Sequence, residues 1–150
     1  MKHLLVIILI FMELVGLASE PTYVIFTSHN SDTTEPHVTH SDYTSSWDQE
    51  IFKYPMHVFH VDCRRLSEYS MFGYIVYVEE QYDAKIERRP LADLDNINVI
   101  DLDKELPTLN KQSMRALINQ MYQAEELYFI DRNYIQNDSV AIYPVRRAGF

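Results

Sequence analysis

Apolar residues along the chain are arranged in short runs typical of β-strands and in one stretch with helical spacing. Runs rich in β-branched and aromatic residues predict strands, because these side chains pack well on a pleated surface. Between Pro107 and Leu127, apolar residues recur at spacings of three and four, which predicts one long amphipathic helix. The predicted strands cover residues 22–27, 56–61, 72–78, 85–88, 97–102, 128–135 and 140–145.

Most of these strands follow one another through short turns. This order predicts an α+β fold, with an antiparallel or mixed sheet of about five or six strands and the helix packed on one face. The segment from residue 28 to 50 is rich in Ser, Thr, Asp and His without a period, and it predicts a long polar loop. No repeat or second change in composition divides residues 19–150, so we expect a single domain.

Residues 1–18 have the pattern of a secretory signal peptide. A basic start at Lys2 precedes an apolar run, and the small residues Gly16 and Ala18 suit cleavage after Ala18. The alternative is a retained membrane anchor, but Glu13 interrupts a run already shorter than the about 20 apolar residues that span a bilayer. We therefore expect export, to the periplasm or as a secreted protein, without stable membrane insertion after the signal is cleaved.

The charge and composition exclude several classes of function. The chain has 13 Lys and Arg against 22 Asp and Glu, and its net charge of −9 argues against nucleic acid as a partner. Its three glycines are far apart, so phosphate-binding loops, dinucleotide-binding loops and the nucleophile elbow of hydrolases are absent. The single cysteine, Cys63, has no partner for a disulfide within the chain. It follows an apolar strand, which predicts a buried thiol.

The histidines are the candidate metal ligands. His37 and His40 are separated by two residues, and so are His57 and His60. Imidazoles bind zinc or copper when they converge with a carboxylate. Because side chains alternate along a strand, His57 and His60 point to opposite faces, and His60 lies beside Asp62. The candidate metal site therefore combines His60 and Asp62 with His37 and His40. The alternative is a solvated loop and two ordinary strand histidines.

Tyrosine is abundant, and all 11 tyrosines follow the predicted signal peptide. Tyrosine is enriched at protein interfaces, where its ring is buried and its hydroxyl stays hydrated. A sheet with more tyrosines than its core holds would expose a contact surface. The residues predicted to form this surface are Tyr74, Tyr77, Tyr128, Tyr134 and Tyr143.

Two short motifs are typical of chains that pass through a secretory route. Asn137 begins the triplet Asn-Asp-Ser, which matches the N-glycosylation acceptor pattern and falls in a predicted turn. Six of the eight arginines stand in pairs, the kind of site at which processing proteases cut precursors. These pairs are Arg64-Arg65, Arg88-Arg89 and Arg146-Arg147.

Together these features predict a small, acidic, exported protein that binds another protein, without catalysis and without a cofactor. The absence of catalytic motifs, the export signal and the abundant tyrosine favour this hypothesis. One alternative is a small exported metal-binding protein or hydrolase that uses His60, Asp62 and the histidines of the predicted loop. Another is a secreted precursor that is cut at the paired arginines.

Overall fold

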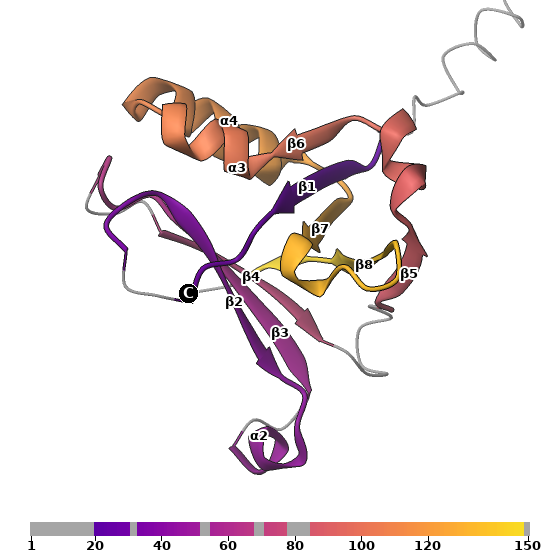
Figure 1. Cartoon of the computed structure of the whole chain (residues 1–150). Coiled ribbons are helices and arrows are strands. Elements are labelled where there is room, and N and C mark those ends of the chain that lie inside the picture. The colour runs from indigo at the N-terminus through magenta and orange to yellow at the C-terminus, as the bar shows by residue number, and fades with distance from the viewer. Residues whose placement is uncertain (1–19, 31–32, 52–54, 68–70, 78–84, 149–150) are drawn as a thin grey trace, which may run out of the picture.

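The computed structural model describes residues 20–30, 33–51, 55–67, 71–77 and 85–148 (Figure 1). The predicted signal peptide lies outside the described residues. The described chain forms a single α+β domain, which confirms the predicted class. The strands form two sheets that share one core, whereas the sequence predicted one sheet.

The first sheet is mixed and has five strands. β1 lies between β7 and β6 and runs parallel to both, whereas β8 runs antiparallel to β7 and to β5. The carboxyl ends of β6, β1 and β7 therefore meet at one edge of the sheet. In order across this sheet, the strands are β5 (Glu87–Pro90), β8 (Ser139–Pro144), β7 (Leu127–Asp131), β1 (Thr22–Phe26) and β6 (Val99–Asp101).

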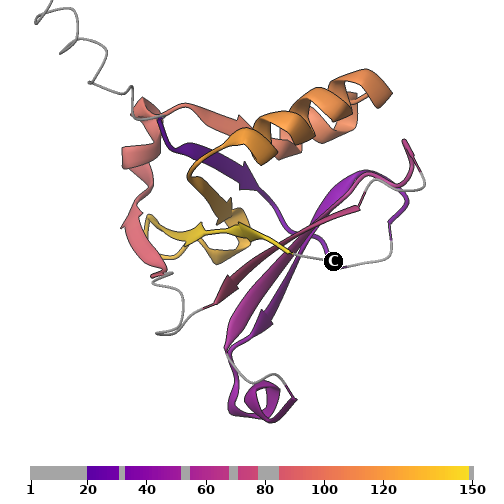
Figure 2. The same cartoon turned by 180° about the vertical axis from the view of Figure 1, so that it is seen from behind.

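The second sheet is antiparallel, with three seven-residue strands and the two-residue β9 at its edge. A correction to the sequence prediction concerns residues 28–50, because this segment forms β2 and a short helix, α2, instead of a long loop. α2 connects β2 to β3 and projects from the body of the molecule (Figures 1 and 2). These elements are β2 (His37–Tyr43), α2 (Ser46–Ile51), β3 (Met56–Asp62), β4 (Met71–Tyr77) and β9 (Arg146–Arg147).

The helices are short, so the prediction of one long helix was wrong. The longest described helix, α4 (Lys111–Gln123), has 13 residues and buries Met114 and Met121. Its N-cap is Asn110, one of the start signals in the sequence, whose side chain accepts hydrogen bonds from the backbone of Gln112 and Ser113. The remaining helical turns are η1 (Leu91–Asn96), α3 (Leu102–Glu105), η2 (Leu106–Thr108) and η3 (Arg132–Tyr134).

Aromatic rings fill the space between the two sheets. Phe26 of β1, Phe59 of β3 and Phe129 of β7 are fully buried and contact one another edge to face, with ring centroids 5.4–5.8 Å apart. Edge-to-face contacts stabilise such clusters beyond the burial of apolar area. A second apolar cluster on the other face of the five-stranded sheet includes Ile25 and Ile130 and packs against η1.

The turn before β8 contains the predicted glycosylation acceptor, Asn137, at an exposed position. Asn137 and Asp138 have φ angles of 50° and 55°, and backbone hydrogen bonds between Gln136 and Ser139 close the turn. Positive φ at both central residues favours Asn followed by Gly.

We expect Asp138→Gly to raise the free energy of unfolding by about 0.5–1 kcal/mol, because glycine adopts positive φ without steric cost. Urea denaturation followed by circular dichroism measures the change. Asp138→Ala is the matched control and should lower the same free energy. Equal stability of the two variants would contradict the argument.

Candidate functional site

A chain of hydrogen-bonded polar side chains joins the two sheets inside the molecule. Asp131 is the last residue of β7, and His40 lies in β2. The exposed fraction of the surface is 1% for Asp131 and 2% for His40. His40 Nδ1 lies 2.8 Å from Asp131 Oδ2, and His40 Nε2 lies 2.9 Å from His57 Nδ1. Asp42 Oδ1, 3.8 Å from His57 Nδ1, is the solvent-facing end of the chain. We call Asp131, His40, His57 and Asp42 the polar chain.

The register of β2 and β3 brings these residues together. Asp42 pairs directly with His57, and His40 pairs with Phe59, so all of them face the five-stranded sheet. Asp131 reaches them from β7, and its Oδ1 accepts hydrogen bonds from the backbone N–H groups of Ser28 and Asn133. Within the described part of the chain, every buried side-chain polar atom has a hydrogen-bond partner. Asp131, His40 and His57 thus form a satisfied buried network, and Asp42 lies at its exposed end.

The environment fixes where protons lie in this network. Burial acts to raise the pKa of Asp131, but hydrogen bonds from His40, Ser28 and Asn133 outweigh it and lower that pKa. The carboxylate therefore accepts a hydrogen bond from His40 Nδ1–H. Burial lowers the pKa of His57 to about 4. His40 Nε2 and His57 Nδ1 share the next hydrogen bond of the network.

A carboxylate that orients an imidazole in this way also occurs in hydrolases, where the imidazole activates a nucleophile. Here His57 occupies the position of the nucleophile. The rings of Tyr134 and Tyr143 also pack against His40, with centroids 4.6 and 5.4 Å away. The arrangement therefore connects β2, β3 and β7, and aromatic rings pack against His40.

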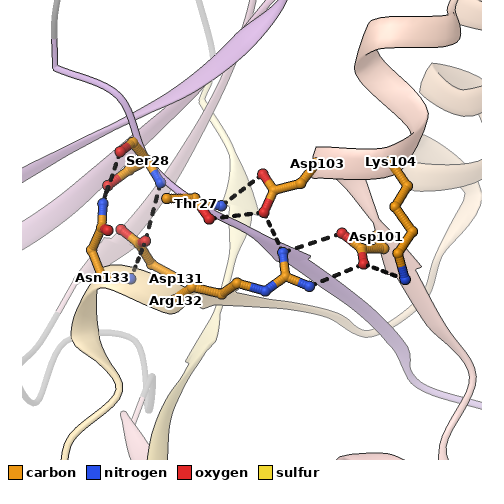
Figure 3. Close-up of polar contacts among 8 residues, drawn as sticks. All are labelled: Thr27, Ser28, Asp101, Asp103, Lys104, Asp131, Arg132 and Asn133. Carbon is orange, nitrogen blue, oxygen red and sulfur yellow. Dashed lines mark hydrogen bonds and ion pairs between the residues drawn. The ribbon is translucent and has the colours of Figure 1, made fainter.

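A second polar cluster lies at the carboxyl ends of β6, β1 and β7 (Figure 3). The guanidinium group of Arg132 donates to Asp101, at 3.0 and 3.2 Å, and to Asp103. Lys104 Nζ lies 3.0 Å from Asp101, and the backbone N–H and the hydroxyl of Thr27 donate to Asp103. Arg132 and Lys104 balance the charges of Asp101 and Asp103, so the cluster carries no net charge. Its hydrogen bonds and ion pairs connect the ends of β6, β1 and β7.

The predicted metal ligands lie on both faces of the second sheet. His37, His60 and Asp62 are on the outer face, whereas His40 is on the inner face, bound to Asp131. The Asp62 carboxylate accepts hydrogen bonds from the guanidinium and the backbone N–H of Arg64, and these bonds lower its pKa. Among the residues described, no three His, Cys, Asp or Glu side chains form a group that could hold a metal ion.

Cys63 is buried directly after β3. Burial raises the pKa of its thiol to about 11, so the thiol is protonated at neutral pH. A protonated, enclosed thiol is a poor nucleophile.

The predicted tyrosine surface is divided between the two sheets. Tyr143 is buried in the core, Tyr134 is half-buried against His40, and Tyr128 is half-buried and stacks on Tyr23 at 5.1 Å. The backbones of Tyr74 and Tyr77 belong to β4, and their side chains lie outside what the structure describes. Residues 74 and 77 are thus on a different sheet from 128 and 143.

Among the described residues, the two most exposed large apolar side chains lie at the tip of the β2–β3 hairpin. Trp47 and Ile51 of α2 are 68% and 63% exposed, and their spacing of four places them on one side of the helix. The Ser45 hydroxyl accepts a hydrogen bond from the backbone N–H of Asp48, and the Asp48 carboxylate accepts from the backbone and hydroxyl of Ser45. This capping box fixes the first turn of α2. The Ser-x-x-Asp pattern is a sequence signal for the helix that the reasoning from sequence missed.

Within the described residues, no helix combines the length and the apolar character needed to cross a membrane. Comparison of the chain with protein-family models, with curated proteins and with solved structures finds no match.

Proposed function

We propose that this chain is an exported protein that acts by binding another protein, without catalysis, through the tip of its β2–β3 hairpin. The exposure of Trp47 and Ile51 on α2 is the observation that supports this proposal most strongly. Tryptophan is the side chain most enriched among residues that dominate binding energy at interfaces. An exposed pair of large apolar side chains on a projecting element is typical of an interaction site.

The charge around this tip indicates the chemistry of the partner. Asp42, Asp48 and Glu50 lie within five residues of Trp47 along the chain, and the whole chain has a net charge of −9. Like charges repel across an interface, which disfavours a second copy of this chain or an anionic membrane at the tip. The favoured partner is a protein with an apolar pocket that receives Trp47 and a rim of Lys and Arg side chains.

The capped helix supports tight binding because it presents its side chains in an ordered conformation. A preorganised anchor loses less conformational entropy when it binds than a flexible loop does. The hydrogen bonds between Ser45 and Asp48 hold α2 at the end of two fully paired strands. These hydrogen bonds therefore order the first turn of α2, which carries Trp47.

The positions of the paired arginines favour binding over processing as a precursor. Arg88 and Arg89 pair with β8, and Arg146 and Arg147 pair with β4. Arg65 binds Glu35. Proteases cut exposed, unpaired segments, so the two pairs that lie in strands, Arg88-Arg89 and Arg146-Arg147, are poor substrates in the folded chain.

The sole tryptophan of the chain makes the proposal directly testable, because intrinsic fluorescence reports on Trp47 alone. A photo-cross-linking residue at position 51 identifies the partner in the native extracellular fluid, and the partner is then purified. On titration with it, we expect the emission of Trp47 to shift to the blue and acrylamide quenching to fall. Calorimetry of Trp47→Ser should show affinity reduced by about 30-fold or more.

Met71→Ser is the matched control, because Met71 is also a large exposed apolar residue but lies on β4, away from the tip. Its affinity should stay within about threefold of the unaltered protein. The proposal is wrong if position 51 cross-links to no protein. It is also wrong if Trp47→Ser and Met71→Ser bind the purified partner equally well.

A further inference from the structure

A cavity of about 260 Å³ opens outside the carboxyl end of β1, between α3–η2 and the start of β2. Its floor consists of Val38, Leu102 and Leu106, which are almost completely buried in the core. In sheets with parallel strands, ligands commonly bind beyond the carboxyl ends of those strands. The volume is near the lower end of that of small-molecule pockets and suits a ligand of about ten non-hydrogen atoms.

The polar groups of this cavity are mainly hydrogen-bond acceptors. His37 lines the cavity at the start of β2, and its Nδ1–H donates to the carbonyl oxygen of Glu35, 2.8 Å away, so that donor is not offered to a ligand. The Asp103 carboxylate lies at the rim of the cavity, where its oxygens accept hydrogen bonds from Thr27 and form an ion pair with Arg132. The Thr27 hydroxyl donates its proton to Asp103, so its oxygen also presents lone pairs. A complementary ligand therefore brings donors.

We infer that this cavity binds a small primary amine with an apolar body, independently of the protein-binding tip. The apolar body lies on Val38, Leu102 and Leu106, and the ammonium group donates to the acceptors at the rim. The net charge of −9 attracts a cation and repels an anion of the same shape. The preference for an amine follows from the hydrogen-bond acceptors at the rim and from the negative net charge of the protein.

The test uses three probes with the same aromatic body: 2-phenylethylamine, 2-phenylethanol and 3-phenylpropionate. Each is titrated into the ¹⁵N-labelled protein, and backbone amide shifts are followed by NMR. We expect saturable shifts centred on Thr27, His37 and Leu106, with a Kd for the amine of about 0.1–1 mM. The carboxylate should bind at least about tenfold more weakly, and the alcohol should be intermediate.

Two variants separate the local acceptor from the overall charge. Asp103→Asn and Asp93→Asn each remove one negative charge, but only Asp103 lines the cavity. We expect Asp103→Asn to weaken amine binding by about tenfold and Asp93→Asn by less than about twofold. His29→Ala provides a second test that does not touch the polar cluster, because His29 lines the cavity but is exposed. It should weaken binding by about threefold.

Three results would overturn the inference. The first is the absence of saturable shifts at these residues up to about 10 mM amine, about tenfold above the weakest expected Kd. The second is carboxylate binding equal to that of the amine. The third is an equal effect of Asp103→Asn and Asp93→Asn, which would mean that only the overall charge attracts the amine. None of these outcomes depends on whether the tip binds a protein.

Discussion

Replacement of Asp131 by alanine is expected to lower the free energy of unfolding by about 3–5 kcal/mol. The carboxylate accepts hydrogen bonds from His40 and from two backbone N–H groups in a site that excludes water. Its removal leaves these donors buried and unpaired, and each lost partner has a desolvation cost of about 1–3 kcal/mol. Urea denaturation followed by circular dichroism measures the change, because Trp47 at the exposed tip does not report on the core.

Asp93→Ala is the control, since Asp93 is exposed on η1 and its loss should change the free energy of unfolding by less than about 0.5 kcal/mol. If Asp131→Ala does not fold, the double variant His40→Phe with Asp131→Leu replaces both partners by apolar groups. The double variant should lose less free energy of unfolding than the two single variants together, because it leaves no buried polar group without a partner. A cost below about 1 kcal/mol for Asp131→Ala would contradict a structural role for the polar chain.

The core strands that the sequence predicted have largely apolar inner faces. β1 and β3 illustrate this, because Phe26 and Phe59 contact partners by apolar packing that alternation reveals directly. β2 escaped prediction because two of its inward positions, His40 and Asp42, are polar. The partner that makes His40 a core residue, Asp131, lies 91 positions later in the chain. No local pattern contains that information.

The sequence also does not determine which aromatic residues form an exposed surface. Tyr143 is buried and Trp47 is exposed, and the residue type alone does not distinguish the two environments. The sequence does contain the capping box that begins α2. The cavity beside Asp103 forms only where β1, β2 and α3 converge, and such an arrangement depends on strand order, which composition and periodicity do not determine.

Acidification from pH 6.5 to 4 is expected to lower the free energy of unfolding by about 3 kcal/mol through His57 alone. Burial lowers the pKa of His57 from 6.5 to about 4, with nearby His40 acting in the same direction and Asp42 opposing it. In this range the unfolded chain binds a proton at residue 57 and the folded chain does not, so stability falls as the pH falls. The lowered pKa values of His60 and Asp131 act in the same direction, with the contribution of Asp131 lost at still lower pH.

The measurement is a series of urea denaturations between pH 7 and pH 4, with His57→Gln as the test variant. Glutamine donates a hydrogen bond toward His40 but does not titrate, so the variant should lose most of the pH dependence while staying folded at neutral pH. His29→Gln removes an exposed imidazole and should keep the full dependence. Equal slopes for His57→Gln and the unaltered protein would show that acid weakens the fold elsewhere. A reduced slope for His57→Gln alone would identify the contact between β2 and β3 beneath the projecting tip as the acid-labile part of the molecule.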